Sequence, residues 1–197
     1  MTSSRSWPPL VLASTSSYRR DLLDRLQLPF EVESPGIDET PEPGESPRER
    51  ALRLAAAKAR AVAGRRPDAI VIGSDQVAAC DTQLLGKPGD AARCRAQLAA
   101  LSGRMADFHT ACALLAPGHP AAVHIDTTRV RFRTLDPAEI ERYVERERPY
   151  DCAGGFKAEG LGIALFESIE SHDPTALIGL PLMWLAGALR AAGCQVP

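Results

Sequence analysis

Apolar positions along the chain fall into short runs of strand length and longer segments with helical spacing. The runs at 9–13 and 69–73 are continuous and apolar, which is typical of buried strands. Leu22, Leu23 and Leu26 recur at helical spacing directly after the first run. Strand and helix patterns alternate in this way to the end of the chain, and this alternation predicts an α/β fold.

Start and stop signals mark out the remaining elements. Ser46 and Glu49 form the pattern of a capping box, with Pro47 at the first helical position. The expected helices run from Ser46 to about Gly64, from Asp90 to about Leu101, from Asp136 to before Pro149, and over 181–192 with Gly193 as the cap. The further expected strands are 30–33, 108–115, 122–132 and 163–169, with a hairpin over 77–85 that turns near Asp81 and Thr82.

Length and charge limit the class of protein. A chain of 197 residues fits one domain with a sizeable core, and no repeat or linker divides it, so we expect a single domain over 1–197 with 1–9 as a flexible extension. The net charge of −2 gives no overall field for nucleic acid or an anionic membrane. Phosphate binding would therefore need a local cluster of cations.

The cysteines and the apolar runs point to a cytoplasmic protein. The five cysteines are odd in number and scattered, with no CxxC pair, which favours free thiols in a reducing compartment. Residues 1–9 lack the apolar stretch of a signal peptide, and no apolar run approaches the roughly 20 residues that cross a bilayer.

A hydroxyl-rich segment, 14–17, leads from the first strand into the first helix. Ser14 and Ser16, with the backbone N–H groups of a helix start, can bind an anion. Arg19 and Arg20 oppose the helix dipole there, and a bound oxyanion would remove that conflict. The alternative is that both arginines pair with nearby aspartates.

Lys58 and Asp75 are charged residues in apolar surroundings. Lys58 lies on the apolar stripe of its helix, where a lysine either extends to the rim or meets an anion in a cleft. Asp75 is expected to end the buried strand, at the edge where open α/β sheets bind ligands, or else to cap the next turn. Gly73 before it would allow a ligand or another backbone to approach closely.

An acidic loop and two glycine-flanked lysines complete the candidate site. Asp38 and Glu39 form a solvated loop face or, with Asp75, supply the oxygen ligands that Mg²⁺ or Mn²⁺ takes while it touches phosphate. Lys87 and Lys157 are weak signals individually. Together, cations, carboxylates and a hydroxyl-rich helix start indicate metal-assisted hydrolysis of a phosphoanhydride.

Taken together, these motifs resemble the Maf family of nucleotide pyrophosphatases. The resemblance runs from Leu10 to about Arg190 and rests on an ordered series of short motifs. The series is Leu12-Ala13-Ser14-Thr15-Ser16 with Arg19-Arg20, Asp38-Glu39-Thr40, Lys58-Ala59, Ile72-Gly73-Ser74-Asp75-Gln76, Gly86-Lys87-Pro88, Leu101-Ser102-Gly103, Lys157-Ala158-Glu159-Gly160 and Gly179-Leu180-Pro181.

The resemblance implies a fold, a reaction and residue roles. The fold would be the Maf-like, ITPase-like one: a mixed, curved sheet flanked by helices, in a homodimer. The reaction would release pyrophosphate by cleavage between the α- and β-phosphates. Asp75 would activate water or hold metal, with Asp38 or Glu39 as a further metal ligand. The phosphate-side groups would be Arg19, Lys58, Lys87 and Lys157.

Three positions distinguish the branches of the family. Tyr18, Gln76 and Glu159 resemble the branch that acts on 7-methyl-GTP, which carries Trp, Gln and Glu there. The branch that acts on dTTP and UTP carries Arg, Thr and Gln. Methylation at N7 makes the guanine base cationic, which suits an aromatic face and a carboxylate. Here Tyr18 replaces the Trp and Ser17 the preceding Pro, and Tyr18 alternatively packs on Leu22 in the core.

Two further functions remain as alternatives. One is the same reaction on dTTP, UTP or other non-canonical nucleotides. The other is a nucleotide-binding regulatory protein linked to cell division, in which hydrolysis is incidental. The expected partner in each case is a small-molecule nucleotide. Nucleic-acid binding is not expected, because no basic stripe with interleaved aromatics occurs.

Overall fold

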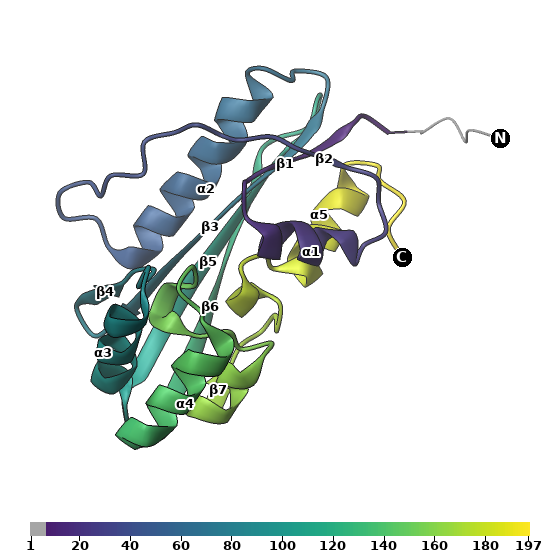
Figure 1. Cartoon of the computed structure of the whole chain (residues 1–197). Helices are drawn as coiled ribbons and strands as arrows, with labels where there is room; N and C mark the ends of the chain where they lie inside the picture. Colours follow the sequence, from purple (N-terminus) through teal and green to yellow (C-terminus); the bar gives the residue numbers. More distant parts are fainter. Residues whose placement is uncertain (1–6) are drawn as a thin grey trace. The chain divides into compact units, whose positions relative to one another are not determined.

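Strands and helices alternate along the chain in the computed structural model, which describes residues 7–197 (Figure 1). The strands are β1 (Leu10–Ala13), β2 (Glu31–Val32), β3 (Ile70–Cys80), β4 (Gln83–Leu85), β5 (Met105–Leu115), β6 (Ala122–Phe132) and β7 (Phe166–Glu170). The helices are α1 (Ser17–Asp24), α2 (Pro47–Ala63), α3 (Ala91–Leu101), α4 (Pro137–Glu147) and α5 (Leu182–Ala191). Short 3-10 turns occur at Ala153–Gly155, Leu161–Leu165 and Ala176–Ile178. The predicted α/β class is confirmed.

The strands form a mixed sheet in the hydrogen-bonded order β2-β1-β3-β5-β6-β7, with β4 paired to β3. β1 runs parallel to both β2 and β3, with Leu12 opposite Ile72 and Ala13 opposite Gly73. β4 and β7 run antiparallel to their neighbours β3 and β6. The mixed sheet with flanking helices agrees with the expected fold.

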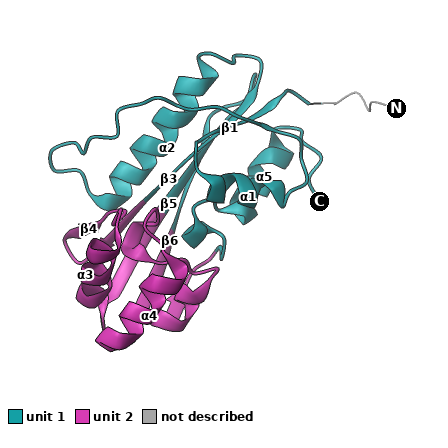
Figure 2. Cartoon of the chain, in the orientation of Figure 1, with its two compact units in different colours: residues 1–76, 110–126, 173–197 teal, residues 77–109, 127–172 magenta. Residues whose placement is uncertain are grey.

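Contacts divide the chain into two compact units (Figure 2). The first unit contains residues up to 76 with 110–126 and 173–197, and the second contains 77–109 and 127–172. β3, β5 and β6 each contribute residues to both units. The single domain over 1–197 stays a prediction. Most of the expected extension over 1–9 lies outside the described residues.

The core of the first unit lies on one face of β1 and β3. Leu12 and Ile72 are fully buried there against Leu22 of α1 and Leu185 of α5. Strand residues alternate between faces, so Val11, between Leu10 and Leu12, points to the opposite face, and β1 also contacts α2. Helices therefore cover both faces of these strands, with α1 and α5 on one side and α2 on the other (Figure 1).

The predicted capping box at Ser46 is present, and a second one occurs at Asp136. Ser46 accepts from the backbone N–H of Glu49, whose side chain accepts from the N–H of Ser46, at the start of α2. Asp136 and Glu139 make the same reciprocal pair at the start of α4. Each pair satisfies backbone donors that a helix start would otherwise leave without partners.

Two expectations about strands were wrong. β3 does not end at Asp75 but continues to Cys80, because its apolar second half pairs with β4 and is buried. The strand expected over 163–169 starts only at Phe166. Residues Leu161–Leu165 form a 3-10 turn instead, and only glycine fits at position 162, because a Cβ there would lie 2.3 Å from the carbonyl oxygen of Lys157.

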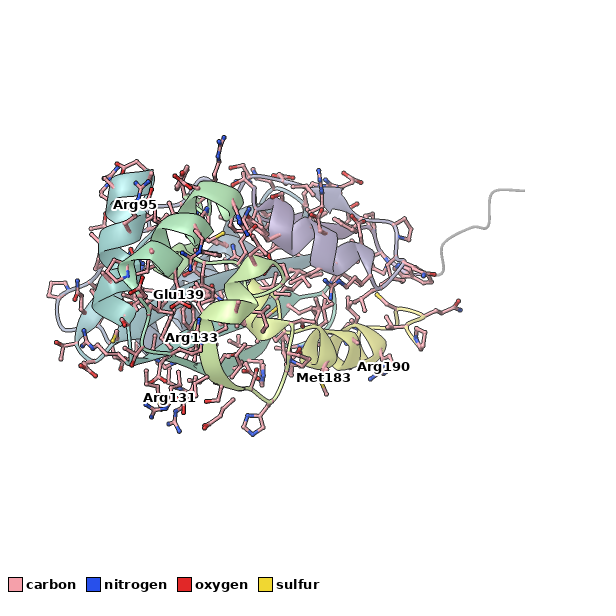
Figure 3. The ribbon with its side chains drawn as sticks, turned by 60° about the horizontal axis from the view of Figure 1, so that its bottom comes forward. Arg95, Arg131, Arg133, Glu139, Met183 and Arg190 are labelled. Carbon is pink, nitrogen blue, oxygen red and sulfur yellow. The ribbon has the colours of Figure 1, made fainter. Side chains whose placement is uncertain are left out.

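Aromatic and ionic contacts organise the second unit. Phe156 packs edge-on against Phe108, Phe132 and Phe166, with ring centroids 4.8–5.6 Å apart. Arg133 reaches Glu139 at the start of α4 with a 3.3 Å contact between Nη2 and Oε1 (Figure 3). These contacts fix the segment that carries Lys157.

Candidate functional site

A buried lysine lies between two carboxylates in the first unit. Lys58 of α2 and Asp75 of β3 are each only 6% exposed. The Nζ of Lys58 lies 2.6 Å from Oδ1 of Asp75 and 2.7 Å from Oε1 of Glu39. Lys58 thus meets two anions, the buried Asp75 and the exposed Glu39, while its own side chain stays buried. Asp75 does not cap a turn, because it lies inside a strand.

Gly73 brings α2 close enough for this contact. A Cβ on Gly73 would lie 2.3 Å from the backbone oxygen of Ala55 and 2.6 Å from the nitrogen of Ala59. The close neighbour expected at Gly73 is therefore the helix backbone. This approach sets Lys58, one residue before Ala59, against Asp75, two residues after Gly73.

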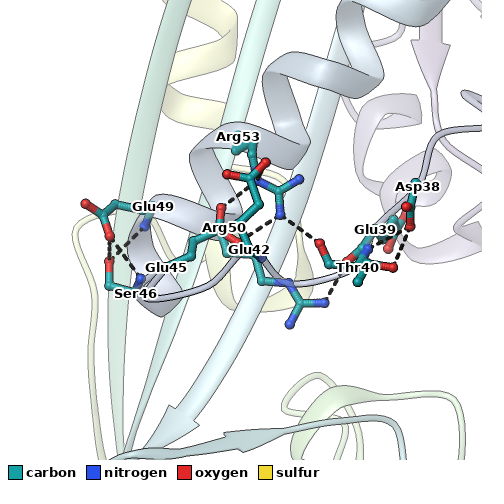
Figure 4. A network of polar contacts seen from close by, with 9 residues as sticks. All are labelled: Asp38, Glu39, Thr40, Glu42, Glu45, Ser46, Glu49, Arg50 and Arg53. Atoms are coloured by element: carbon teal, nitrogen blue, oxygen red, sulfur yellow. Dashed lines mark hydrogen bonds and ion pairs between the residues drawn. The ribbon is translucent and has the colours of Figure 1, made fainter.

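Of the acidic pair, Glu39 faces Lys58. Oδ1 of Asp38 instead accepts from the backbone N–H and hydroxyl of Thr40, at 2.9 and 2.7 Å. Both hydrogen bonds lower the pKa of Asp38, the one from the Thr40 hydroxyl more than the one from the backbone N–H. Figure 4 shows this turn beside the arginines of α2. Asp38 therefore shapes the loop that carries Glu39.

Ser16 is the N-cap of α1, and its hydroxyl oxygen accepts from the N–H of Arg19 at 3.4 Å. Ser14 is buried and accepts from the N–H of Ser16 at 3.1 Å. Both hydroxyls retain hydrogens to donate, which keeps the predicted anion site chemically possible. Tyr18, the second residue of α1, is half-buried.

The two arginines of α1 differ. Arg20 is exposed and lies 3.5 Å from Asp21. Arg19 donates through Nε to the carbonyl of Gly179 at 2.9 Å. Burial lowers the pKa of Arg19, while the charges of Asp75 and then Glu39 oppose that shift. Arg19 therefore lies in the electrostatic field of Asp75 and Glu39, the two carboxylates that contact Lys58. Of the two arginines, Arg20 alone shows the expected pairing with an aspartate.

Gln76 is already engaged by the protein. Its Nε2 donates to the hydroxyl of Thr110 at 2.9 Å and to the carbonyls of Ala176 and Leu177 at 3.1 and 2.9 Å. An amide nitrogen has two hydrogens, which these three acceptors share, so this group has none left for a base. Gln76 therefore holds the segment before Gly179.

Ser74 is a residue that sequence reasoning missed. It is fully buried, and its hydroxyl lies 2.8 Å from the carbonyl of Ala111 and 2.9 Å from that of Gly179. Gly179 therefore receives contacts from both Ser74 and Arg19. The position of Ser74 directly before Asp75 was the only feature of the sequence that could have indicated its role.

The second unit carries the remaining predicted residues. Lys87 and Glu159 are exposed, and Lys157 is half-buried. Lys157 lies 3.8 Å from Glu147 at the end of α4, and Glu147 also accepts from the N–H of Leu161 at 2.8 Å. Sequence reasoning missed Glu147, which holds both ends of the turn that contains Glu159.

A family model described as Maf-like protein matches residues 9–192. The chain belongs to the Maf family. Curated relatives match over nearly their whole length. A protein of Xanthomonas oryzae pv. oryzae (strain MAFF 311018), named 7-methyl-GTP pyrophosphatase, is 58% identical over 190 residues, covering 96% of this chain and 100% of the relative. A protein of Bordetella pertussis with the same name is 55% identical, covering 94% and 93%.

The Maf chain also shares its fold with a solved structure. A HAM1 protein from Coxiella burnetii aligns with a TM-score of 0.50 and 17% identity, covering 93% of this chain and 99% of that one. At this identity the likeness concerns the fold alone. The expected Maf-like, ITPase-like architecture agrees with it.

The donors around Lys58 fit the divalent metal that the family implies. Among the described residues, no group of three or more His, Cys, Asp or Glu side chains gathers as a metal site. Mg²⁺, however, is commonly held by one or two carboxylates with substrate phosphates and water. Glu39 and Asp75 converge on one cation, the ammonium of Lys58, and together the three groups sum to one negative charge. Two carboxylates with net negative charge suit such an ion.

In the part of the chain that the structure describes, no helix is long and apolar enough to span a membrane. The five cysteines are free thiols, and Cys152 is the one that is not buried.

Proposed function

We propose that this Maf protein hydrolyses a nucleoside triphosphate between its α- and β-phosphates, releasing the monophosphate and pyrophosphate, with 7-methyl-GTP as the substrate. The observation that carries the proposal is the buried ammonium of Lys58 between the carboxylates of Glu39 and Asp75. The names of the relatives from Xanthomonas and Bordetella support the choice of substrate.

The residues of the first unit divide the chemistry among them. Asp75 positions water and accepts its proton, and its buried setting keeps its orientation fixed. Lys58 and Arg19 neutralise phosphate oxygens, and Arg19 is oriented by its bond to Gly179. A divalent ion held by Glu39 and Asp75, Mg²⁺ or Mn²⁺, supplies further neutralisation of the phosphates when bound. Ser14 and Ser16 donate hydroxyl hydrogens to the anion.

The residues proposed for the second unit bind the phosphates and the base, and each role can be tested by its own substitution. Lys87 and Lys157 bind phosphate, and the carboxylate of Glu159 accepts hydrogen bonds from the N–H groups of the base. Tyr18 of the first unit offers an aromatic face to the cationic base. Asp38 contributes through the shape of the acidic loop.

We further propose that the protein is a cytoplasmic homodimer that does not bind nucleic acid. The net charge of −2 and the free cysteines support the compartment and the lack of nucleic-acid binding. The dimer rests on the family resemblance. Light scattering on the purified protein, which gives the molar mass in solution, tests it directly: a mass of one chain would refute it.

Pyrophosphate release with Mg²⁺ or Mn²⁺ tests the reaction and the substrate together. The panel is 7-methyl-GTP, GTP, dTTP, UTP, CTP and ITP, with Asp75→Asn as the blank. We expect turnover of 7-methyl-GTP that is lost in Asp75→Asn, and a loss of its preference over GTP in Glu159→Gln. Turnover of dTTP and UTP alone would keep the reaction and refute the substrate. No turnover of any nucleotide would favour a nucleotide-binding regulatory protein.

A further inference from the structure

Two arginines of α2 hold the acidic loop that carries Glu39 (Figure 4). Arg50 donates to the backbone carbonyl of Glu39 at 2.9 Å. Arg53 donates to the backbone carbonyl of Thr40 at 3.1 Å. Consecutive carbonyls of the loop, one of them that of Glu39 itself, are thus bound by side chains one helical turn apart.

Arg53 is itself fixed in place. Its Nε and Nη2 contact the two carboxylate oxygens of Glu45 at 2.5 and 2.8 Å, and Glu42 lies 3.4 Å from Nε. The side chains of Arg53 and Glu45 are only 25% and 7% exposed. A two-pronged, largely covered arginine–carboxylate pair is far more ordered than an exposed ion pair. The hydrogen bond from Arg53 is the main cause that lowers the pKa of Glu45 to about 2.

The loop benefits from such support because its residues are exposed to solvent. Glu39 has a side chain that is 53% exposed, and residues 38–44 are exposed along their length. Its carboxylate nevertheless lies 2.7 Å from a lysine whose side chain is only 7% exposed. An exposed, irregular segment reaches a fixed buried partner reliably only if its backbone is anchored.

We propose that Arg50 and Arg53 are positioning residues, which we call the arginine clamp, and that they act on the reaction by keeping the Glu39 carboxylate on Lys58 opposite Asp75. The catalytic role of the arginine clamp rests on the proposed function. Neither arginine bonds to Lys58 or Asp75, so its effect passes through the backbone of Glu39 and Thr40. Removal of the clamp leaves Lys58 and Asp75 paired but allows Glu39 to leave.

A double-mutant cycle between Arg53 and Glu39 tests the coupling. The variants are Arg53→Gln, Glu39→Gln and the combination, with Arg60→Gln on the exposed side of α2 as the matched control. We expect Arg53→Gln to lower kcat about tenfold with KM within about twofold, because substrate contacts remain. The combined variant should be no slower than Glu39→Gln alone, and Arg60→Gln should behave as wild type. Multiplied losses in the combination would overturn the proposal.

Hydrogen–deuterium exchange separates a failure of the clamp from a failure of the proposed function. In Arg53→Gln, amides of residues 39–46 should exchange faster than in wild type, while the exchange of β3 amides stays unchanged. In Arg60→Gln, exchange over both segments should equal that of wild type. This result is independent of any nucleotide, so it stands even if no substrate is turned over. Unchanged exchange over 39–46 would overturn the clamp whatever the assay shows. Faster exchange throughout α2 and β3 would overturn it too, as a sign of general destabilisation.

Discussion

At the scale of single residues, the buried ion pair decides how the site is built. Lys58 and Asp75 are both nearly inaccessible, and two buried charges are tolerated only when each keeps its partner. The sequence indicated that Lys58 lies on an apolar face and that Asp75 and the acidic loop could share a metal site. It could not indicate that the ammonium of Lys58 contacts both Asp75 and Glu39, because the contact with Glu39 depends on the path of an irregular loop.

Lys58→Met should therefore be strongly destabilising. It leaves the carboxylate of Asp75 buried without its cation, which costs about 3–5 kcal/mol of unfolding free energy. Lys58→Met combined with Asp75→Asn should recover part of that loss, since the unpaired charge is gone. Urea unfolding measures both, with Arg60→Met as the exposed control within about 0.5 kcal/mol of wild type. A double variant no more stable than Lys58→Met would contradict the pairing.

At the scale of elements, the starts of the helices could be predicted from the sequence, while the full length of β3 and the 3-10 turn at Leu161–Leu165 could not. The capping signals at Ser46 and Asp136 placed the starts of α2 and α4, because the interactions involved are local. The hairpin over 77–85 is confirmed, but its first strand was not recognised as the continuation of the buried strand before it, because the polar residues Ser74, Asp75 and Gln76 interrupt the apolar pattern. The turn Leu161–Leu165 was missed because its apolar residues resemble a strand, and the close approach of Gly162 to the carbonyl of Lys157 gives no signal in that pattern.

The contact between β3 and α2 gives a prediction for Gly73→Ala. The new methyl group would lie 2.3 Å from the oxygen of Ala55, in the backbone of α2, which has no flexible end to yield. Forcing the helix away should cost about 1–3 kcal/mol and reduce hydrolysis by moving Lys58. Gly187→Ala in α5, whose nearest atom is 3.8 Å away, should instead raise stability by about 0.5–1 kcal/mol. Equal effects of the two changes in urea unfolding would refute the close approach.

At the scale of the whole molecule, candidate residues are spread over two compact units. The first unit brings together Arg19, Glu39, Lys58 and Asp75, while Lys87, Lys157 and Glu159 belong to the second. Sequence motifs identified residues of both units because each motif is a local signal. The supports were missed, as with Ser74, Glu147 and the arginine clamp, because each contacts an irregular segment whose path the local sequence pattern does not indicate.

Acid should destabilise the molecule over a defined pH range. Glu45 has its pKa lowered from 4.5 to about 2 by Arg53, and the pKa values of Asp38, Glu49, Asp90, Glu139 and Glu141 are also lowered by their hydrogen bonds. A carboxyl group whose pKa is lower in the folded state contributes stability above its unfolded pKa, and that contribution is lost as pH falls toward the folded pKa.

The free energy of unfolding should consequently decrease steadily as the pH is lowered from about 4.5 to 2. In this range the unfolded chain binds more protons than the folded one. Glu45→Gln removes one of these groups, so its stability should depend less steeply on pH than that of wild type over the same range. Urea unfolding at pH 5, 4, 3 and 2.5 measures both slopes, because each slope equals the difference in bound protons between the two states. Parallel curves for wild type and Glu45→Gln would mean that the Arg53 pair does not hold Glu45 ionised in the folded protein.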